Sequence, residues 1–152
     1  MCVRSAPRYL QPVGRRNRCV LLNVNRQHPE PRRIGQAVAY LEEGRVIGYP
    51  TDSLYALGAD PWSRPAVDKI YSLRRLDPKK PLSLMMTDLR QVARYAILDD
   101  ECFRFMRRVL PGPYTFVLRA TREAPRRSQD RRRAVGIRIP DSPVALALIE
   151  AL

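Results

Sequence analysis

The sequence predicts a single α/β domain in which helices cover a sheet, and three observations carry this prediction. The chain has 152 residues, the usual size of one globular domain. Its hydrophobic content of 45% can supply a packed core, while no run of about 18 apolar residues is present to span a membrane. Segments with the pattern of strands alternate with helical segments, as in sheets that helices cover.

The first part of the chain predicts a strand and then a helix. Valine and leucine crowd the segment Arg18–Val24, which is typical of a short strand. After a proline-rich connector, apolar side chains recur at helical spacing at Ile34, Val38 and Leu41. Gly44 follows as a candidate C-cap, because glycine adopts the left-handed conformation that ends many helices.

Two strands and a second helix come next. Arg45–Tyr49 predicts a strand that Pro50 ends, and Thr51–Gly58 predicts a turn and a further strand. Ser63 is a candidate N-cap. It precedes a helix whose predicted buried side chains are Val67, Ile70, Tyr71 and Leu73.

The remaining elements continue the alternation. Leu82–Met86 is an apolar run of strand length, and Asp88 can cap a short helix after it. Another helix is predicted over Asp100–Leu110, where prolines end it. Aromatic and β-branched residues predict a strand over Tyr114–Leu118. The last predicted elements are a strand at Ala134–Ile139 and a helix with Ser142 as N-cap and Pro143 as first residue.

The net charge of +13 is concentrated in two segments. Residues 1–33 hold eight arginines and one acid, and residues 119–138 hold eight arginines and two acids. Residues 34–118 are nearly neutral, with twelve basic and ten acidic side chains. Concentrated positive charge favours polyanions such as RNA, through phosphate contacts and counterion release. A solvated, arginine-rich surface without a partner is the alternative, and both interpretations stay open.

The ends and the cysteines set further expectations. Residues 1–17 are basic, contain no acid and lack the apolar region of a secretory signal. We therefore expect a disordered leader, or a start codon placed too far upstream, and a domain over residues 18–152. The three cysteines form no CxxC pair, so neither a disulfide framework nor a zinc ribbon is predicted. No metal site is predicted, and a reducing, cytoplasmic location is expected.

The segment Tyr49–Gly58 is the best candidate for chemistry. A strand runs into a turn that Pro50 fixes, and ligands of open α/β sheets often bind at such strand ends. The hydroxyls of Thr51 and Ser53 can hold a small polar substrate, and Asp52 can orient a donor or an amino group. An ordinary capped turn explains the same residues, so both interpretations stay open.

Five segments form a pattern in a fixed order along the chain. They are GRVIGYPTDSLYALGAD (Gly44–Asp60), IYSLRR (Ile70–Arg75), KKPLSLM (Lys79–Met85), LPGPYTFVL (Leu110–Leu118) and VGIRIPDSP (Val135–Pro143). With these segments the chain resembles the YrdC-like family, which includes the TsaC threonylcarbamoyl-AMP synthases, and it is most similar to the YciO branch. The resemblance implies a twisted mixed sheet with flanking helices around a concave basic cleft.

The resemblance also implies an ATP-dependent reaction. Threonine and bicarbonate form threonylcarbamate, which attacks the α-phosphate of ATP to give threonylcarbamoyl-AMP and pyrophosphate. The product serves the t6A modification of tRNA, and ATP with Mg²⁺ is the implied cofactor. The implied threonine contacts are Thr51, Ser53 and Tyr55. The implied nucleotide or phosphate contacts are Arg74, Lys80, Thr115 and Arg138, while no residue is assigned as catalytic.

Two features depart from the pattern of the synthases. Where the synthases carry a Lys-x-Arg motif, this chain has Arg74, Arg75 and Leu76, so an apolar side chain replaces the second cation. A lost phosphate cation removes electrostatic stabilisation of the transition state. The Ser-x-Asn signature of the family, which contacts nucleotide, is absent, and the chain ends within a predicted helix at Leu152. We therefore expect that the C-terminal part of the family domain is missing.

Three functions remain open on these grounds. The chain is an L-threonylcarbamoyladenylate synthase or part of one, or a module that binds double-stranded RNA or nucleotide without that activity, or a shortened product with neither function. Double-stranded RNA binding is associated with the family, and RNA shape is read through phosphate and 2′-hydroxyl contacts. Double-stranded RNA or tRNA, ATP and threonine are the expected partners. The candidate RNA contacts are Arg126, Arg127, Arg131, Arg132 and Arg133.

Overall fold

The computed structural model describes residues 19–77 and 80–152 of the chain. The basic leader predicted over residues 1–17 lies outside these ranges, and so does Lys79 of the segment Lys79–Met85. The domain boundary predicted at residue 18 lies outside them as well and stays a prediction. Within the described ranges, no helix combines the length and the apolar character needed to cross a bilayer.

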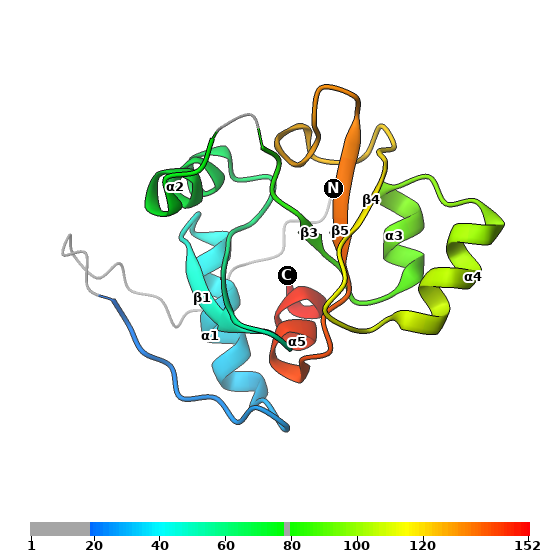
Figure 1. The fold of residues 1–152 in the computed structure, drawn as a ribbon. Helices are drawn as coiled ribbons and strands as arrows, with labels where there is room; N and C mark the ends of the chain where they lie inside the picture. The colour runs from blue at the N-terminus through cyan, green and yellow to red at the C-terminus, as the bar shows by residue number, and fades with distance from the viewer. Residues whose placement is uncertain (1–18, 78–79) are drawn as a thin grey trace, which may run out of the picture.

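The strands form two small sheets (Figure 1). The first is an antiparallel hairpin of β1 (Ile47–Pro50) and β2 (Tyr55–Gly58). The second has the strand order β3-β5-β4. In it, β5 (Ala134–Arg138) pairs in parallel with β3 (Leu84–Met85) and antiparallel with β4 (Phe116–Arg119). The predicted α/β fold with mixed strand directions is confirmed, with its strands divided between two sheets.

Helices flank both sheets. Figure 1 shows α3 and α4 on one side of the three-stranded sheet and α1 and α5 beside the hairpin. A short 3₁₀ helix, η1, lies in the connection between β4 and β5. The helices span Pro31–Glu42 (α1), Arg64–Arg74 (α2), Leu89–Tyr95 (α3), Asp100–Val109 (α4), Arg126–Ser128 (η1) and Pro143–Ala151 (α5).

Two clusters of buried side chains hold these elements together. The first lies between the three-stranded sheet and the helices α3 and α4, and its members Val92, Met106, Val135 and Ile137 have no exposed surface. Burying each such side chain stabilises the fold by about 1.5–3 kcal/mol. The second cluster joins α1, β1 and α5 through Ile34, Val38, Tyr49, Val144, Ala145 and Leu148. The hairpin and the three-stranded sheet therefore have separate cores.

Side-chain alternation along β5 gives the three-stranded sheet two different faces. Val135 and Ile137 belong to the core, whereas Gly136 and Arg138 lie on the opposite face, because successive residues of a strand alternate. The register pairs Gly136 with Val117 of β4, whose side chain is 72% exposed. This second face of the sheet is therefore accessible to a ligand, and Arg138 is its charged residue on β5.

The helix starts confirm two predicted caps and modify a third. Asp88 accepts a hydrogen bond from the N–H of Gln91 at 2.8 Å, so it is the N-cap of α3. Ser142 accepts one from the N–H of Ala145 at the start of α5. Ser63 occupies the N-cap position of α2, but its hydroxyl makes no capping hydrogen bond.

Two predicted features are wrong. The segment predicted as a strand at Arg18–Val24 forms no strand over its described residues 19–24, where Leu21 is 89% exposed. Apolar content alone does not make a strand, because its backbone groups need partners on a neighbouring strand. Leu73 is 55% exposed rather than buried. The buried stripe of α2 runs beside it through Ala66, Val67, Ile70 and Tyr71.

Candidate functional site

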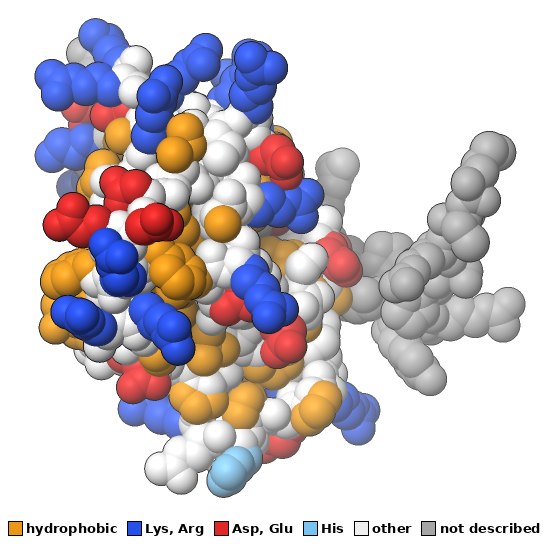
Figure 2. All heavy atoms as spheres, turned by 90° about the vertical axis from the view of Figure 1, so that its right-hand side faces the viewer, with side chains coloured by type: hydrophobic (Ala, Val, Ile, Leu, Met, Phe, Trp, Pro, Cys, Tyr) orange, Lys and Arg blue, Asp and Glu red, His pale blue; other side chains and the backbone are white. Residues whose placement is uncertain are grey.

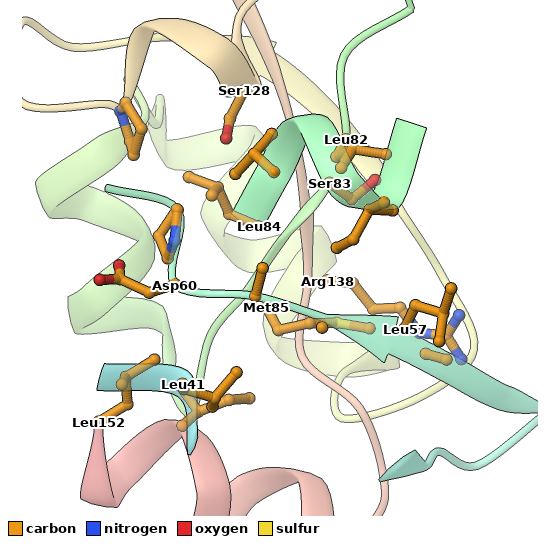
Figure 3. A pocket seen from close by; sticks show the side chains of 18 of the residues that line it. Leu41, Leu57, Asp60, Leu82, Ser83, Leu84, Met85, Ser128, Arg138 and Leu152 are labelled. Atoms are coloured by element: carbon orange, nitrogen blue, oxygen red, sulfur yellow. The ribbon is translucent and has the colours of Figure 1, made fainter. Parts of the chain in front are cut away.

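A cleft of about 860 Å³ is lined by residues from both sheets and from α2 and α5 (Figure 3). Most of its lining side chains are apolar, and two are acidic, Glu42 and Asp60. Four basic side chains also line it, namely Arg74, Lys80, Arg94 and Arg138. Apolar walls with an excess of positive charge suit a ligand that carries both an anionic group and an apolar part.

All four residues predicted to contact nucleotide or phosphate line this cleft. Arg74 is the last residue of α2, and Lys80 lies in the loop after it. Thr115 directly precedes β4, and Arg138 ends β5. Tyr71 donates a hydrogen bond of 2.6 Å to the carbonyl of Lys80, which fixes the loop against α2. The four side chains thus border the same cleft, while their role as nucleotide contacts stays a prediction.

The Arg138 guanidinium links β5 to the turn that follows β1. Its Nη2 donates hydrogen bonds to Asp52 Oδ1 at 2.6 Å and to Ser53 Oγ at 3.0 Å. The Arg138 side chain is 16% exposed and that of Asp52 is 9% exposed. Figure 3 shows Arg138 pointing toward the end of the pocket where Leu57 lies. The two charged residues are 86 positions apart, and no local sequence signal predicts their contact.

Thr51 is engaged within the turn rather than in the lining of the cleft. Its Oγ1 donates a hydrogen bond of 2.6 Å to the carbonyl of Leu54. The same oxygen accepts from the N–H groups of Ser53 and Leu54, each at 3.3 Å. A hydroxyl that bonds to nearby backbone groups in this way stabilises a tight turn. Thr51 thereby fixes the backbone of the turn on which Asp52 and Ser53 lie.

The other two predicted threonine contacts differ in their surroundings. Ser53 is hydrogen-bonded to the cleft residue Arg138. Tyr55 is 70% exposed, and its hydroxyl accepts a hydrogen bond of 2.9 Å from Arg26 Nη2. Thr51, Ser53 and Tyr55 all lie outside the lining of the cleft, so their role as threonine contacts stays a prediction.

Tyr49 and Arg94 line the cleft as well, although the sequence assigns neither of them a role as a contact residue. Burial raises the pKa of Tyr49, and the nearby positive charge of Arg138 offsets part of this rise. The Tyr49 hydroxyl is therefore protonated near neutral pH and can donate a hydrogen bond. Arg94 lies in the last turn of α3 and pairs with Glu123 at 2.7 Å. Helical spacing predicts on which face of α3 Arg94 lies, but it does not predict that this face borders the cleft.

Leu76, which replaces the second cation of the synthase motif, also lines the cleft. It follows Arg75, which has a left-handed backbone conformation (φ 50°) and ends α2. Among the described residues, no group of three or more metal-ligating side chains is present.

The candidate RNA contacts lie in the connection between β4 and β5. Figure 2 shows Lys and Arg side chains gathered at the top of the molecule, where this connection lies in Figure 1. Arg127 forms an ion pair with Asp68 of α2 and stacks over the Tyr71 ring, so it holds the connection against α2. Of the candidate contacts, Arg126, Arg131, Arg132 and Arg133 are exposed. Their role in RNA binding stays a prediction.

Comparisons with known proteins agree with this architecture. The model of the Sua5/YciO/YrdC family, described as "Telomere recombination", matches residues 39–152. The uncharacterized protein YciO of Escherichia coli (strain K12) is 42% identical over 130 residues, which cover 85% of this chain and 63% of YciO. The threonylcarbamoyl-AMP synthase of Halorhodospira halophila is 37% identical over 122 residues, covering 80% of this chain and 64% of the synthase.

Solved structures show the same similarity. The crystal structure of E. coli YciO matches with a TM-score of 0.81 and 41% identity, covering 85% of this chain and 63% of that one. The structure of P. abyssi Sua5 complexed with L-threonine matches with a TM-score of 0.80 and 29% identity, covering 88% of this chain and 39% of that one. This chain thus spans less than two thirds of the length of these relatives. By sequence and by structure, the chain belongs to the Sua5/YciO/YrdC family.

Proposed function

We propose that this chain binds L-threonine and ATP and takes part in the formation of threonylcarbamoyl-AMP. The observation that carries the proposal is the position of Arg138, which lines the cleft together with three other basic side chains and is held there by Asp52 and Ser53. The similarity to threonylcarbamoyl-AMP synthases and to Sua5 complexed with L-threonine supports it. A cytoplasmic location, where threonine, ATP and tRNA occur together, is part of the same proposal.

The proposed reaction develops negative charge on its phosphate and carbamate groups, and the basic side chains of the cleft can stabilise this charge. The threonine nitrogen attacks the carbon of bicarbonate, and water leaves as the carbamate forms. A carbamate oxygen then bonds to the α-phosphorus of ATP while the bond to the β-phosphate breaks and pyrophosphate leaves. Arg138 would stabilise the negative charge that gathers at the carbamate and the α-phosphate. Arg74 and Lys80 would stabilise the charge of the leaving pyrophosphate.

ATP with Mg²⁺ fits the donors of the cleft. The basic side chains can contact a triphosphate, and Mg²⁺ bound together with it would supply further charge neutralisation. Thr115 offers a hydroxyl beside the phosphates or the ribose. Leu76 contributes no charge at the position where the synthases carry a cation, so we expect Leu76→Arg to strengthen ATP binding.

Binding and turnover are measured separately to test this proposal. Titration calorimetry of the full chain with L-threonine and with ATP·Mg²⁺ measures binding, and pyrophosphate release measures turnover. We expect release only when threonine, bicarbonate and ATP are all present, and loss of binding in Arg138→Gln. Arg45→Gln is the matched control, because Arg45 is 51% exposed and lies outside the lining of the cleft. A full chain that does not bind threonine contradicts the proposal.

Binding of double-stranded RNA or tRNA is the second candidate function. The observation that favours it is the run of exposed arginines Arg131–Arg133 in the connection between β4 and β5. If these residues contact phosphates, replacing all three by glutamine lowers the number of counterions released on duplex binding by about two to three. The plot of log binding constant against log salt concentration then has a shallower slope. The triple glutamine variant of Arg104, Arg107 and Arg108, which are exposed on α4, is the matched control. An unchanged slope removes Arg131–Arg133 from the RNA interface.

A further inference from the structure

The ion pair between Asp52 and Arg138 differs from the surface ion pairs of this protein. Its two side chains are 9% and 16% exposed. In the pairs Arg45–Glu43, Arg64–Asp68, Arg94–Glu123 and Arg127–Asp68, every side chain is at least 36% exposed. Exposed ion pairs contribute little to stability, whereas breaking a buried pair leaves an uncompensated buried charge and is strongly destabilising. The Asp52–Arg138 pair is therefore held firmly in one arrangement.

The contact is made through one hydrogen bond between the two charged groups. Asp52 Oδ1 accepts from Arg138 Nη2, while Asp52 Oδ2 and Arg138 Nε are both buried without a hydrogen-bond partner. Arginine–carboxylate pairs are frequently bidentate, with two parallel hydrogen bonds, whereas this pair makes one. The single contact orients the guanidinium and leaves its Nε donor unused.

The turn that carries Asp52 is itself fixed before any ligand binds. The hydroxyl of Thr51 closes the turn through three hydrogen bonds to backbone groups of Ser53 and Leu54. Ser142 Oγ donates to the carbonyl of Pro50 at 3.1 Å, which ties the start of the turn to the N-terminus of α5. A supporting residue that is locked in this way can hold a binding group in a productive geometry.

We propose that Asp52 is a positioning residue, whose carboxylate holds the Arg138 guanidinium in the cleft so that the remaining donors of Arg138 meet the negative charge of the ligand. This inference rests on the proposed function, because the ligand is the threonine or nucleotide of the same cleft. It adds that Asp52 acts through Arg138 and not by touching the ligand. Loss of Asp52 then weakens binding only as long as Arg138 is present.

The first measurement needs no ligand and tests the arrangement itself. The ¹⁵N–¹H spectrum records the Nε–H signal of Arg138, which is assigned by its disappearance in Arg138→Lys. We expect slow hydrogen exchange at this group in the native chain and exchange faster by about tenfold or more in Asp52→Asn, because the side chain is released. Glu43→Gln is the matched control, since it breaks an exposed ion pair, and should exchange as the native chain does. Unchanged exchange in Asp52→Asn overturns the proposal.

The second measurement separates positioning from direct contact. We expect Asp52→Asn to weaken L-threonine binding by about thirtyfold or more, as truncation of a buried charge pair does. In the Arg138→Lys background the same replacement should cause a much smaller loss, because the two residues act as a unit. Equal losses in both backgrounds would show that Asp52 touches the ligand, and they overturn the proposal. A full chain that shows the expected exchange but binds no threonine contradicts the proposed function alone.

A charge-conserving variant covers the case in which Asp52→Asn does not fold. Asp52→Glu keeps the negative charge and displaces the carboxylate by one methylene group. We expect faster Nε–H exchange and weaker threonine binding in Asp52→Glu, with an unchanged circular dichroism spectrum. Native exchange together with native binding in this variant shows that the placement of the carboxylate does not matter, and this result overturns the proposal.

Discussion

A β-carbon on Gly136 would lie 2.8 Å from the Oγ of Ser83, closer than two such atoms approach in folded proteins. Gly136 is in the middle of β5, and Ser83 directly precedes β3, the parallel neighbour of β5. Both lie on the face of the sheet that carries Arg138, and Ser83 also lines the cleft. Glycine at position 136 therefore allows β5 to pass close to the Ser83 side chain.

Gly136→Val is expected to lower the free energy of unfolding. Its side chain has to displace Ser83 or shift β5, and such overpacking costs about 1–3 kcal/mol. Urea-induced unfolding followed by circular dichroism measures the change. Threonine binding should weaken as well, since the added methyl groups lie on the face that carries Arg138.

Gly35→Ala is the control for this prediction. Gly35 lies within α1, and a β-carbon there would meet no atom within 4 Å. We expect Gly35→Ala to raise the free energy of unfolding by about 0.5–1 kcal/mol, because alanine favours a helix over glycine. A loss of stability in both glycine variants would contradict the explanation by close contact with Ser83.

The helix caps give a prediction in which two similar positions should differ. Asp88→Ala removes the hydrogen bond of 2.8 Å to the N–H of Gln91 and should cost about 0.5–2 kcal/mol. Ser63→Ala removes a hydroxyl that makes no capping bond and should change the free energy of unfolding by less than about 0.5 kcal/mol. Urea midpoints of the two variants, measured under the same conditions, make the comparison. An equal cost would show that Ser63 does cap α2 in solution.

The features of the fold that the sequence predicts well are those set by neighbouring residues, such as helix caps and the buried face of a helix. Asp88 and Ser142 mark true helix starts because a capping bond reaches only three residues along the chain. The buried positions Ile34, Val38 and Leu41 follow from helical spacing alone. Segment 19–24 has apolar residues of the strand type and yet forms no strand, because strand formation depends on partners elsewhere in the chain.

The candidate site is only partly accessible to the same reasoning. The resemblance to the family indicates Arg74, Lys80, Thr115 and Arg138, and the fold does bring these four side chains to one cleft. The contact between Asp52 and Arg138 depends on how a turn in the hairpin meets the end of β5, which no local pattern encodes. Whether two distant residues meet is decided by the packing of the elements that carry them.

Tyr49 makes the free energy of unfolding depend on pH in the alkaline range. Burial raises its pKa above the usual value of 10.0. The folded chain therefore keeps this proton at pH values where the unfolded chain has lost it, so stability is unaffected below pH 10 and falls as the pH rises from there through the pKa of the folded chain. Tyr49→Phe should flatten this decline in urea unfolding at a series of alkaline pH values. Tyr114→Phe, at an exposed tyrosine, is the control and should leave the decline in place.

Two adjacent residues of α4 should respond very differently to truncation. Met106 is fully buried between α4 and the three-stranded sheet, so Met106→Ala is expected to cost about 2–5 kcal/mol through lost burial and a remaining cavity. Phe105 is 56% exposed and contacts Phe116 edge to face at 6.1 Å between ring centres. Phe105→Ala should therefore cost less than Met106→Ala, because it removes a partly exposed ring and one aromatic contact worth about 0.5–1.5 kcal/mol beyond the area that it buries. Urea unfolding of both variants measures the difference, and a larger cost for Phe105→Ala would mean that α4 faces the sheet in another orientation.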